Sequence, residues 1–168
     1  MPLLTLTLWP ALTDPGQQQV IAHELGDHTA RLLHKQRSLT AVAIHGAPAA
    51  WFIGGEPLQD PGGAAPRSFA LEIRITAGTN TAEEKTTWIA AAWDTMRQAV
   101  PGVLAEASYV SIVEIPAGDW GYGGLTQAAR SSRPAAPSRP EGNHPCLEPG
   151  RGQDQWGIAG VSAKALGR

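Results

Sequence analysis

The chain repeats one order of expected elements in two successive halves, and this repeat limits the folds that it can form. Each half predicts a strand, a helix and a second strand, and then ends in an aromatic residue followed closely by Gly-Gly. The strands are expected at residues 3–9 and 40–45 in the first half, and at 69–76 and 108–115 in the second. Because β-α-β crossovers are right-handed, the two units predict an α+β fold, with one four-stranded sheet and two helices on one face.

The local sequence pattern supports these assignments. Leucines at every second position from Leu4 to Leu8 predict a strand with one buried face. Asp14 is suited to cap the first helix, along which apolar residues then recur at intervals of four and three. Thr81 and Glu84 have the spacing of a capping box, which predicts the start of the second helix.

Composition divides the chain after residue 124. Residues 125–168 contain five prolines and six glycines with almost no aliphatic periodicity, which is typical of a tail without a stable fold. We therefore expect one domain at 1–124, made of unit 2–55 and unit 68–124 with a linker at 56–67. A Pro/Gly-rich tail at 125–168 follows it.

Charge and composition exclude several classes of function. Residues 1–129 contain seven basic and twelve acidic residues, whereas residues 130–168 contain six and three. An acidic body argues against a nucleic-acid surface, and no apolar run approaches the roughly 20 residues that span a membrane. Because Cys146 is the single cysteine, no internal disulfide can form, and a reducing, cytoplasmic location is expected.

Pro2 is the first candidate for chemistry. Methionine is usually removed before a small residue, and removal here would leave the secondary amine of Pro2 as the amino terminus. The ordinary pKa of a terminal amine is about 8, and burial or a nearby cation lowers this pKa toward the range in which a general base works best. The apolar side chains expected around Pro2 are Leu4, Trp51, Phe52 and Trp120, so desolvation is the expected cause.

Taken together, these features resemble a known family. The Met1-Pro2 start, the two β-α-β units and the segments at 51–55 and 114–124 are similar to the 4-oxalocrotonate tautomerase superfamily. Within it, the subgroup of cis-3-chloroacrylic acid dehalogenase also fuses two units in one chain. The resemblance covers residues 2–124. It implies a homotrimer, a small-molecule substrate, no cofactor or metal, and catalysis by Pro2.

The resemblance also assigns other residues of the site. His28 matches a substrate-binding histidine of the dehalogenases, although its place on the apolar face of the helix equally suits a core histidine. Two family arginines fall at Thr76 and Thr79, a tyrosine falls at Ser111, and a water-activating glutamate falls near Gly121. These departures argue against dehalogenation and acrylate hydration, and they indicate a substrate less anionic than is usual in the family.

Arg74 is the best candidate to replace the missing arginines. It lies two residues before Thr76 and therefore points to the same side of the strand, although it is also placed to pair with Glu72 at the surface. The substrate-binding residues predicted from the resemblance and from this spacing are Arg74, Thr76, Thr79, Ser111, Trp51 and Trp120.

The activity expected first is keto-enol tautomerisation by an amino-terminal proline. The alternatives are a Pro2-dependent hydration, decarboxylation, dehalogenase-like or ring-forming reaction, and a non-catalytic binding module on the same fold. A zinc site is not expected, because His23 and His28 are five residues apart and lie roughly 140° from each other around a helix. The Gly-Gly groups suit hairpin turns better than a phosphate-binding loop.

Overall fold

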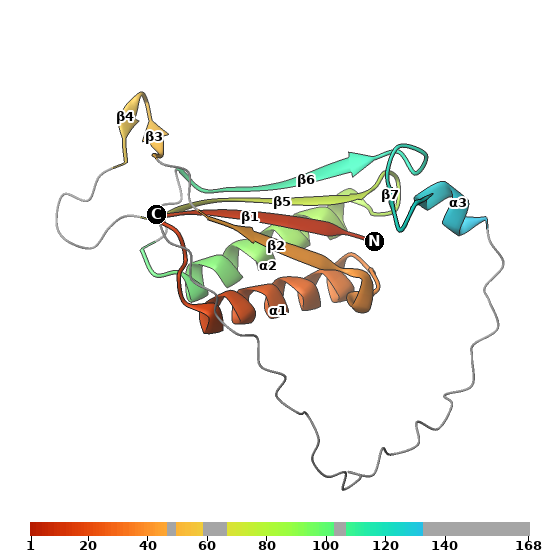
Figure 1. Ribbon diagram of the computed structural model, residues 1–168, viewed down its shortest axis with the longest axis horizontal. Coiled ribbons are helices and arrows are strands. Elements are labelled where there is room, and N and C mark those ends of the chain that lie inside the picture. The colour runs from red at the N-terminus through yellow and green to blue at the C-terminus, as the bar shows by residue number, and fades with distance from the viewer. Residues whose placement is uncertain (47–49, 59–66, 103–106, 133–168) are drawn as a thin grey trace, which may run out of the picture. The chain divides into compact units, whose positions relative to one another are not determined.

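A four-stranded sheet forms the centre of the computed structural model, which describes residues 1–46, 50–58, 67–102 and 107–132 (Figure 1). Its strands, in spatial order, are β2 (Ala41–His45), β1 (Leu3–Trp9), β5 (Ser68–Thr76) and β6 (Tyr109–Ile115). β1 is parallel to β2, β5 is parallel to β6, and the central pair β1–β5 is antiparallel. The predicted α+β fold with one four-stranded sheet is therefore confirmed.

Two helices of 18 residues, α1 (Pro15–Leu32) and α2 (Ala82–Ala99), pack against each other on one face of this sheet (Figure 1). A 3-10 turn (Arg37–Leu39) connects α1 to β2. Asp14 caps α1 as predicted, since its carboxylate accepts a hydrogen bond of 2.9 Å from the Gly16 amide. The predicted capping box of α2 is also present, with Thr81 Oγ1 accepting from the Glu84 amide and the Glu84 carboxylate accepting from the Thr81 amide.

The core lies between the sheet and the helices. Leu4, Leu6 and Leu8 of β1 are fully buried, and the residues between them are half-buried, so the predicted alternation is confirmed. The helices contribute large buried side chains, among them Ile21 of α1 and Trp88 of α2. Burial of a side chain the size of leucine contributes about 1.5–3 kcal/mol, so this layer stabilises the sheet on which the site is built.

Each half of the chain ends in a small hairpin. The first consists of β3 (Phe52–Ile53) and β4 (Glu56–Pro57), and the second of β7 (Gly121–Tyr122) and β8 (Leu125–Thr126). All four turn glycines have positive φ, at 61° and 90° in the first turn and at 56° and 74° in the second. Two successive residues with positive φ are required by a type I′ turn, which explains the Gly-Gly pairs. The predicted hairpin turns are confirmed.

Two described segments lie outside the predicted bounds of the two units. Residues 56–57, expected in the linker, form β4, and residues 125–131, expected in the tail, form β8 and the short helix α3 (Gln127–Ser131). Thr126 caps α3 by accepting a hydrogen bond of 3.1 Å from the Ala129 amide. These short polar elements have no apolar periodicity, so only their turn and cap residues mark them. The rest of the predicted linker and tail, at 59–66 and from 133, lies outside the described residues.

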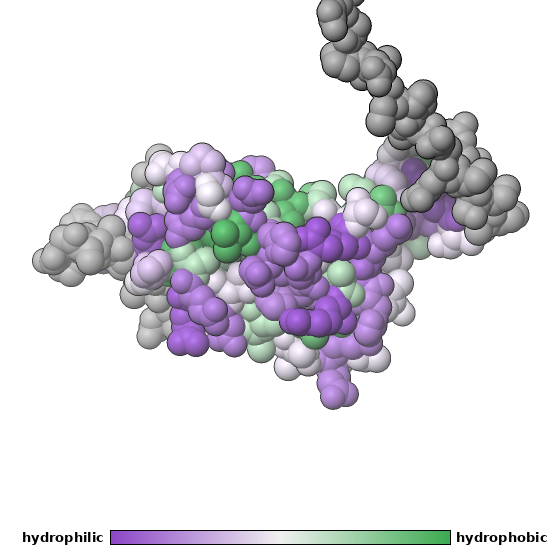
Figure 2. All heavy atoms as spheres, turned by 90° about the horizontal axis from the view of Figure 1, so that it is seen from below, coloured by the Kyte–Doolittle hydropathy of each residue, from purple (hydrophilic) through white to green (hydrophobic). Residues whose placement is uncertain are grey.

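The outer face of the helices is mainly hydrophilic when it is seen from below the sheet (Figure 2). A few hydrophobic side chains of the helices are exposed, chiefly Val20 of α1 at 56% and Ile89 of α2 at 37%. Among the described helices, none is long and apolar enough to cross a membrane.

Candidate active site

One end of the sheet brings together most of the residues that could take part in catalysis or substrate binding. Because of the strand directions, the starts of β1 and β2 meet the ends of β5 and β6. We call this the Pro2 end. It comprises Pro2, the α1–β2 connection (33–40), the turn after β5 (77–81) and the segment after β6 (116–132), and Figure 1 shows the amino terminus there.

Pro2 is buried, and its neighbours fix its backbone. Its carbonyl oxygen accepts a hydrogen bond of 3.1 Å from the Ala41 amide at the start of β2, and the next residue, Leu3, is paired with Arg74 of β5. The pKa of the terminal amine, carried here by Met1, lies below its ordinary value of 8.0, first because of burial and then because of Lys35 and Arg130. The start of β1 therefore favours an uncharged amine.

Lys35, in the α1–β2 connection, is the first of these two cations. Its Nζ donates a hydrogen bond of 2.8 Å to Thr79 Oγ1, and the Thr79 hydroxyl donates one of 2.7 Å to the Thr76 carbonyl oxygen. Asn80 ties the same two segments together, because its Nδ2 donates to the Leu33 carbonyl oxygen at 3.0 Å. Burial lowers the pKa of Lys35, while the charges of Glu84 and Glu114 act in the opposite direction.

Arg130, in α3, is the second cation. Its guanidinium lies 3.6 Å from the centroid of the Tyr122 ring and donates a hydrogen bond of 2.6 Å to the Tyr122 carbonyl oxygen. The Nε of Arg130 and the Nε1 of Trp120 are buried without a hydrogen-bond partner in the described part of the chain. A hollow of about 480 Å³ is lined by residues 118–126, which include Trp120 and Tyr122. Trp120, which carries one of these two unsatisfied donors, therefore lines an open space.

Of the predicted substrate-binding residues, the structure places Arg74, Thr76, Thr79 and Trp120 at or next to the Pro2 end. Arg74 is exposed, and its Nε forms an ion pair of 2.8 Å with Glu72, which is the surface pairing that the sequence left open.

Ser111 and Trp51 lie elsewhere in the chain. Ser111 is farther back along β6, opposite Glu72. Trp51 stands just before β3, after β2 has reached the other end of the sheet. Within one chain, the strand order does not bring either residue to Pro2.

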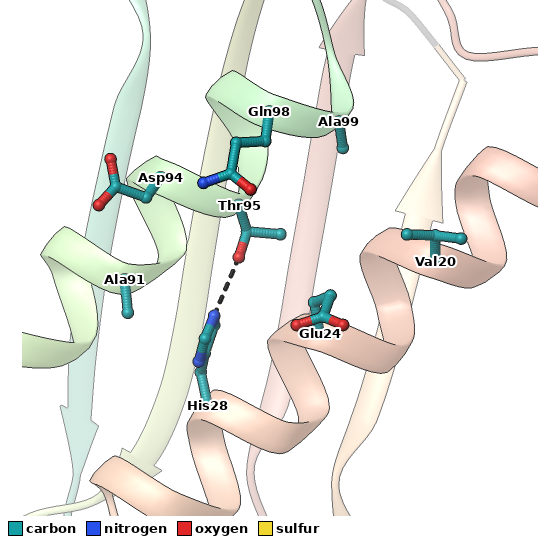
Figure 3. Close-up of a pocket in the computed structure, with 8 residues that line it drawn as sticks. All are labelled: Val20, Glu24, His28, Ala91, Asp94, Thr95, Gln98 and Ala99. Carbon is teal, nitrogen blue, oxygen red and sulfur yellow. Dashed lines mark hydrogen bonds between the residues drawn. The ribbon is translucent and has the colours of Figure 1, made fainter.

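His28 lies in a groove between α1 and α2 (Figure 3). Its Nε2 is 3.0 Å from Thr95 Oγ1, and its Nδ1 is 3.0 Å from a guanidinium nitrogen of Arg31. The groove has a volume of about 500 Å³, and Glu24 and Asp94 also line it. Burial, and then the charge of Arg31, lowers the pKa of His28. Both ring nitrogens have partners in this groove, which favours the structural interpretation of His28 within one chain.

Lys35 and Arg130 were not predicted as site residues, although the sequence holds a signal for each. Lys35 stands between a helix and a strand parallel to β1, so its connection has to end beside the start of β1. Arg130 follows Thr126, a residue type suited to cap a helix. Because residues 125–168 were assigned to the tail, no helix was predicted after Thr126.

Known proteins match this chain by structure. No family model matches it, and no curated protein matches its sequence. A crystal structure of native fused 4-OT matches with a TM-score of 0.64 and 25% identity, over 77% of this chain and 98% of that chain.

The chain has the tautomerase-superfamily fold. Two other structures match the same tautomerase fold at lower identity. Pt0534 inactivated by 2-oxo-3-pentynoate has a TM-score of 0.64 and 15% identity, with 78% of this chain and 99% of that chain covered. A macrophage migration inhibitory factor-like protein from Entamoeba histolytica has a TM-score of 0.58 and 18% identity, with 74% and 97% covered. The predicted resemblance to the superfamily and the predicted two-unit tautomerase fold are confirmed.

Proposed function

We propose that this protein is a cofactor-independent tautomerase in which Pro2, after removal of Met1, is the general base. The observation that carries this proposal is the environment at the start of β1, where the amine of Met1 is partly buried and feels the charges of Lys35 and Arg130 on a tautomerase fold. Burial and neighbouring cations both disfavour the ammonium form. An amine at this position is therefore suited to accept a proton near neutral pH.

The proposed reaction moves one proton within a small carbonyl substrate. The Pro2 nitrogen takes the proton from the enol oxygen, so that an N–H bond forms as the O–H bond breaks. It then gives this proton to the carbon atom, and the electron pair of the enolate forms the new C–H bond. The reverse sequence converts keto to enol, and neither direction needs an oxidant or a reductant.

We further propose that the active protein is a homotrimer. Fused 4-OT is described as a symmetric trimer in one similar structure and as an asymmetric trimer in another. In this chain the helices cover only one face of the sheet, and Tyr109 of β6 is 61% exposed. A neighbouring subunit on the open face would also explain how Ser111 or Trp51 reaches a Pro2 that is not its own. The cytoplasmic location belongs to the same proposal, because Cys146 has no second cysteine to pair with.

A second candidate is a reaction in which Pro2 acts as a nucleophile or acid, such as a hydration, decarboxylation or ring-forming step. Thr76, Thr79 and Gly121 favour this candidate, because they stand where the family has two arginines and a glutamate. Selection for another reaction would replace those family residues. Borohydride reduction with a panel of keto acids tests this candidate, because only an iminium at Pro2 would be trapped as an adduct. The absence of an adduct across the panel would argue against it.

The tautomerase proposal is tested by the conversion of enol to keto phenylpyruvate and 2-hydroxymuconate, with the wild type compared with Pro2→Ala. General-base catalysis typically contributes about 10²–10⁴-fold, so Pro2→Ala is expected to lower kcat/KM by at least about 10²-fold. Equal rates would reject the proposal for these substrates.

The mass of the amino-terminal peptide supplies the control. We expect it to lack Met1, because an acylated proline nitrogen has no basic electron pair. Retention of Met1 in the active protein would exclude every mechanism that uses the Pro2 nitrogen and would leave the binding module as the better interpretation.

A further inference from the structure

His28 links the two helices through both nitrogens of its ring. Its Nε2 points across the groove to Thr95 Oγ1 of α2, at 3.0 Å (Figure 3). Its Nδ1 lies 3.0 Å from a guanidinium nitrogen of Arg31, one turn further along α1. The ring is half-buried, whereas Arg31 is exposed. A titratable side chain thus connects the first repeated unit to the second.

The contact with Arg31 fixes where the imidazole carries its hydrogen. A guanidinium group donates hydrogen bonds and cannot accept them, so Nδ1 has to be the acceptor. A neutral imidazole with a free Nδ1 carries its hydrogen on Nε2, which then donates to Thr95 Oγ1. A proton added to Nδ1 would face the donor group of Arg31 and place two cations side by side. Both contacts therefore form only with the neutral ring.

Several other charges surround His28. They are carboxylates and their basic partners, namely Glu24 and Asp27 with His23, Asp27 with Arg37 of the 3-10 turn, and Asp94 with Arg97 of α2. β2, which also packs against α1, has His45 as its one titratable residue, at the end of the strand away from Pro2. Burial and then Arg31 lower the pKa of His28, although Glu24 and Asp27 act in the opposite direction. The surroundings thus favour the neutral ring that the two contacts require.

We propose that His28 is a proton-sensitive latch, in which the neutral imidazole holds α1 against α2, and protonation in mild acid breaks the Arg31 contact and weakens the junction. This role is independent of Pro2 and of the proposed reaction. The folded state takes up the proton on His28 less readily than the unfolded state, in which the pKa is about 6.5. The stabilisation is therefore complete above pH 6.5 and is lost as pH falls through the lower pKa of the folded protein.

Two measurements on the full chain test the latch without a substrate. Two-dimensional NMR of the isotope-labelled protein follows the ring nitrogens of His28 against pH, and it reports both the pKa and the nitrogen that carries the hydrogen. Urea denaturation between about pH 7.5 and about pH 5.5 reports the unfolding midpoint in the range where histidine titrates. His28→Gln is the main variant, because its amide has a donor and an acceptor for Thr95 and Arg31 but takes up no proton.

We expect the neutral ring to carry its hydrogen on Nε2, and the pKa of His28 to lie below 6.5. The urea midpoint of the wild type should fall with pH relative to that of His28→Gln. In Arg31→Met the pKa of His28 should rise, but it should stay below 6.5 because burial is the first cause of its shift.

His23→Gln is the matched control for the loss of a histidine from α1. His23 is 61% exposed, and its Nδ1 faces the Asp27 carboxylate at 3.3 Å. Because this variant keeps both contacts of His28, its urea midpoint should still fall with pH relative to that of His28→Gln.

Three results would overturn the proposal, namely a hydrogen on Nδ1 of the neutral ring, a His28 pKa at or above 6.5, or parallel midpoint curves for the wild type and His28→Gln. If His28→Gln does not fold, as judged by circular dichroism, the titration of His28 in Arg31→Met decides alone. A higher pKa than in the wild type then supports the latch, and an unchanged pKa rejects it.

Discussion

Trp88 of α2 donates its indole N–H to Oγ1 of Thr29 of α1 over 3.1 Å, and both side chains are fully buried. The Thr29 hydroxyl in turn donates to the Leu25 carbonyl oxygen of its own helix at 2.7 Å. The largest fully buried side chain of the core thus has its polar atom satisfied by one threonine. This contact joins the two repeated units, because α1 belongs to the first and α2 to the second.

Replacement of Thr29 by valine is expected to lower the free energy of unfolding by about 1–3 kcal/mol, because the Trp88 N–H would be buried without an acceptor. Urea denaturation measures this loss. Thr87→Val is the matched control, since Thr87 is exposed and its hydroxyl donates only to the Glu83 carbonyl oxygen of its own helix. It should change the free energy of unfolding by no more than about 0.5 kcal/mol. Equal losses in the two variants would show that the buried hydrogen bond has no special role.

Gly121→Ala is expected to open the second hairpin. A Cβ at position 121 would lie 2.0 Å from the backbone oxygen of Leu125, so the two strands would have to separate. Overpacking typically costs about 1–3 kcal/mol, and here it would also displace Arg130, which follows this hairpin in α3. Gly118→Ala is the control, because a Cβ at 118 would meet no atom within 4 Å. Thermal unfolding and kcat/KM for phenylpyruvate should decline in Gly121→Ala only, and a similar decline in Gly118→Ala would contradict this account.

Acid should destabilise the fold partly through Glu114. The pKa of Glu114 is lowered from its ordinary 4.5, first by the hydrogen bond from Lys85 and then by that from the Gly78 amide. Because the folded state binds this proton less readily than the unfolded state, the stabilisation is present above pH 4.5 and is lost as pH falls through the lower folded pKa. Urea midpoints measured at descending pH should therefore fall less steeply for Glu114→Gln than for the wild type. Parallel curves would show that this carboxylate contributes nothing.

Local patterns made most of the fold predictable from the sequence. The alternation of Leu4, Leu6 and Leu8 is enough to predict a strand with one buried face. Thr81 and Glu84, three residues apart, are enough to predict the capping box that begins α2. Gly-Gly pairs predict their turns because few other residues adopt positive φ at both positions. Each of these signals spans a few residues, and the structure confirms each one.

The candidate site was less predictable because it depends on contacts between distant segments. Lys35 and Thr79 are 44 residues apart, and only the sheet order brings the α1–β2 connection to the turn after β5. Arg74 was preferred as the cation because it shares a side of the strand with Thr76, but on that side it also meets Glu72. Arg74 lies two residues from both Glu72 and Thr76, and this spacing does not show whether its charge is paired with Glu72 or left for a ligand. The choice between these two roles of Arg74 required the structure.

The pH dependence of kcat/KM should change when the charge of Lys35 is removed. Burial, Lys35 and Arg130 all lower the pKa of the Met1 amine. The Pro2 nitrogen would become the amino terminus one residue further along the same chain, so we expect the activity of the processed protein to rise with pH through a pKa below the ordinary 8.0. A cation destabilises the ammonium form, and its removal therefore raises the pKa of the amine. In Lys35→Met, the rising limb of kcat/KM against pH should move to higher pH.

The limb should stay in place in Arg97→Met, which removes an exposed charge on α2, and in His28→Ala, because His28 is engaged with Thr95 and Arg31 in the groove between the helices. Since burial is the first cause of the lowered pKa of the amine, the limb in Lys35→Met should still lie below that of an exposed terminal amine. A rise seen only above about pH 9 would place the base on another group. A limb that moves with His28 but not with Lys35 would assign the titration to the histidine and remove the main support for Pro2 as the base.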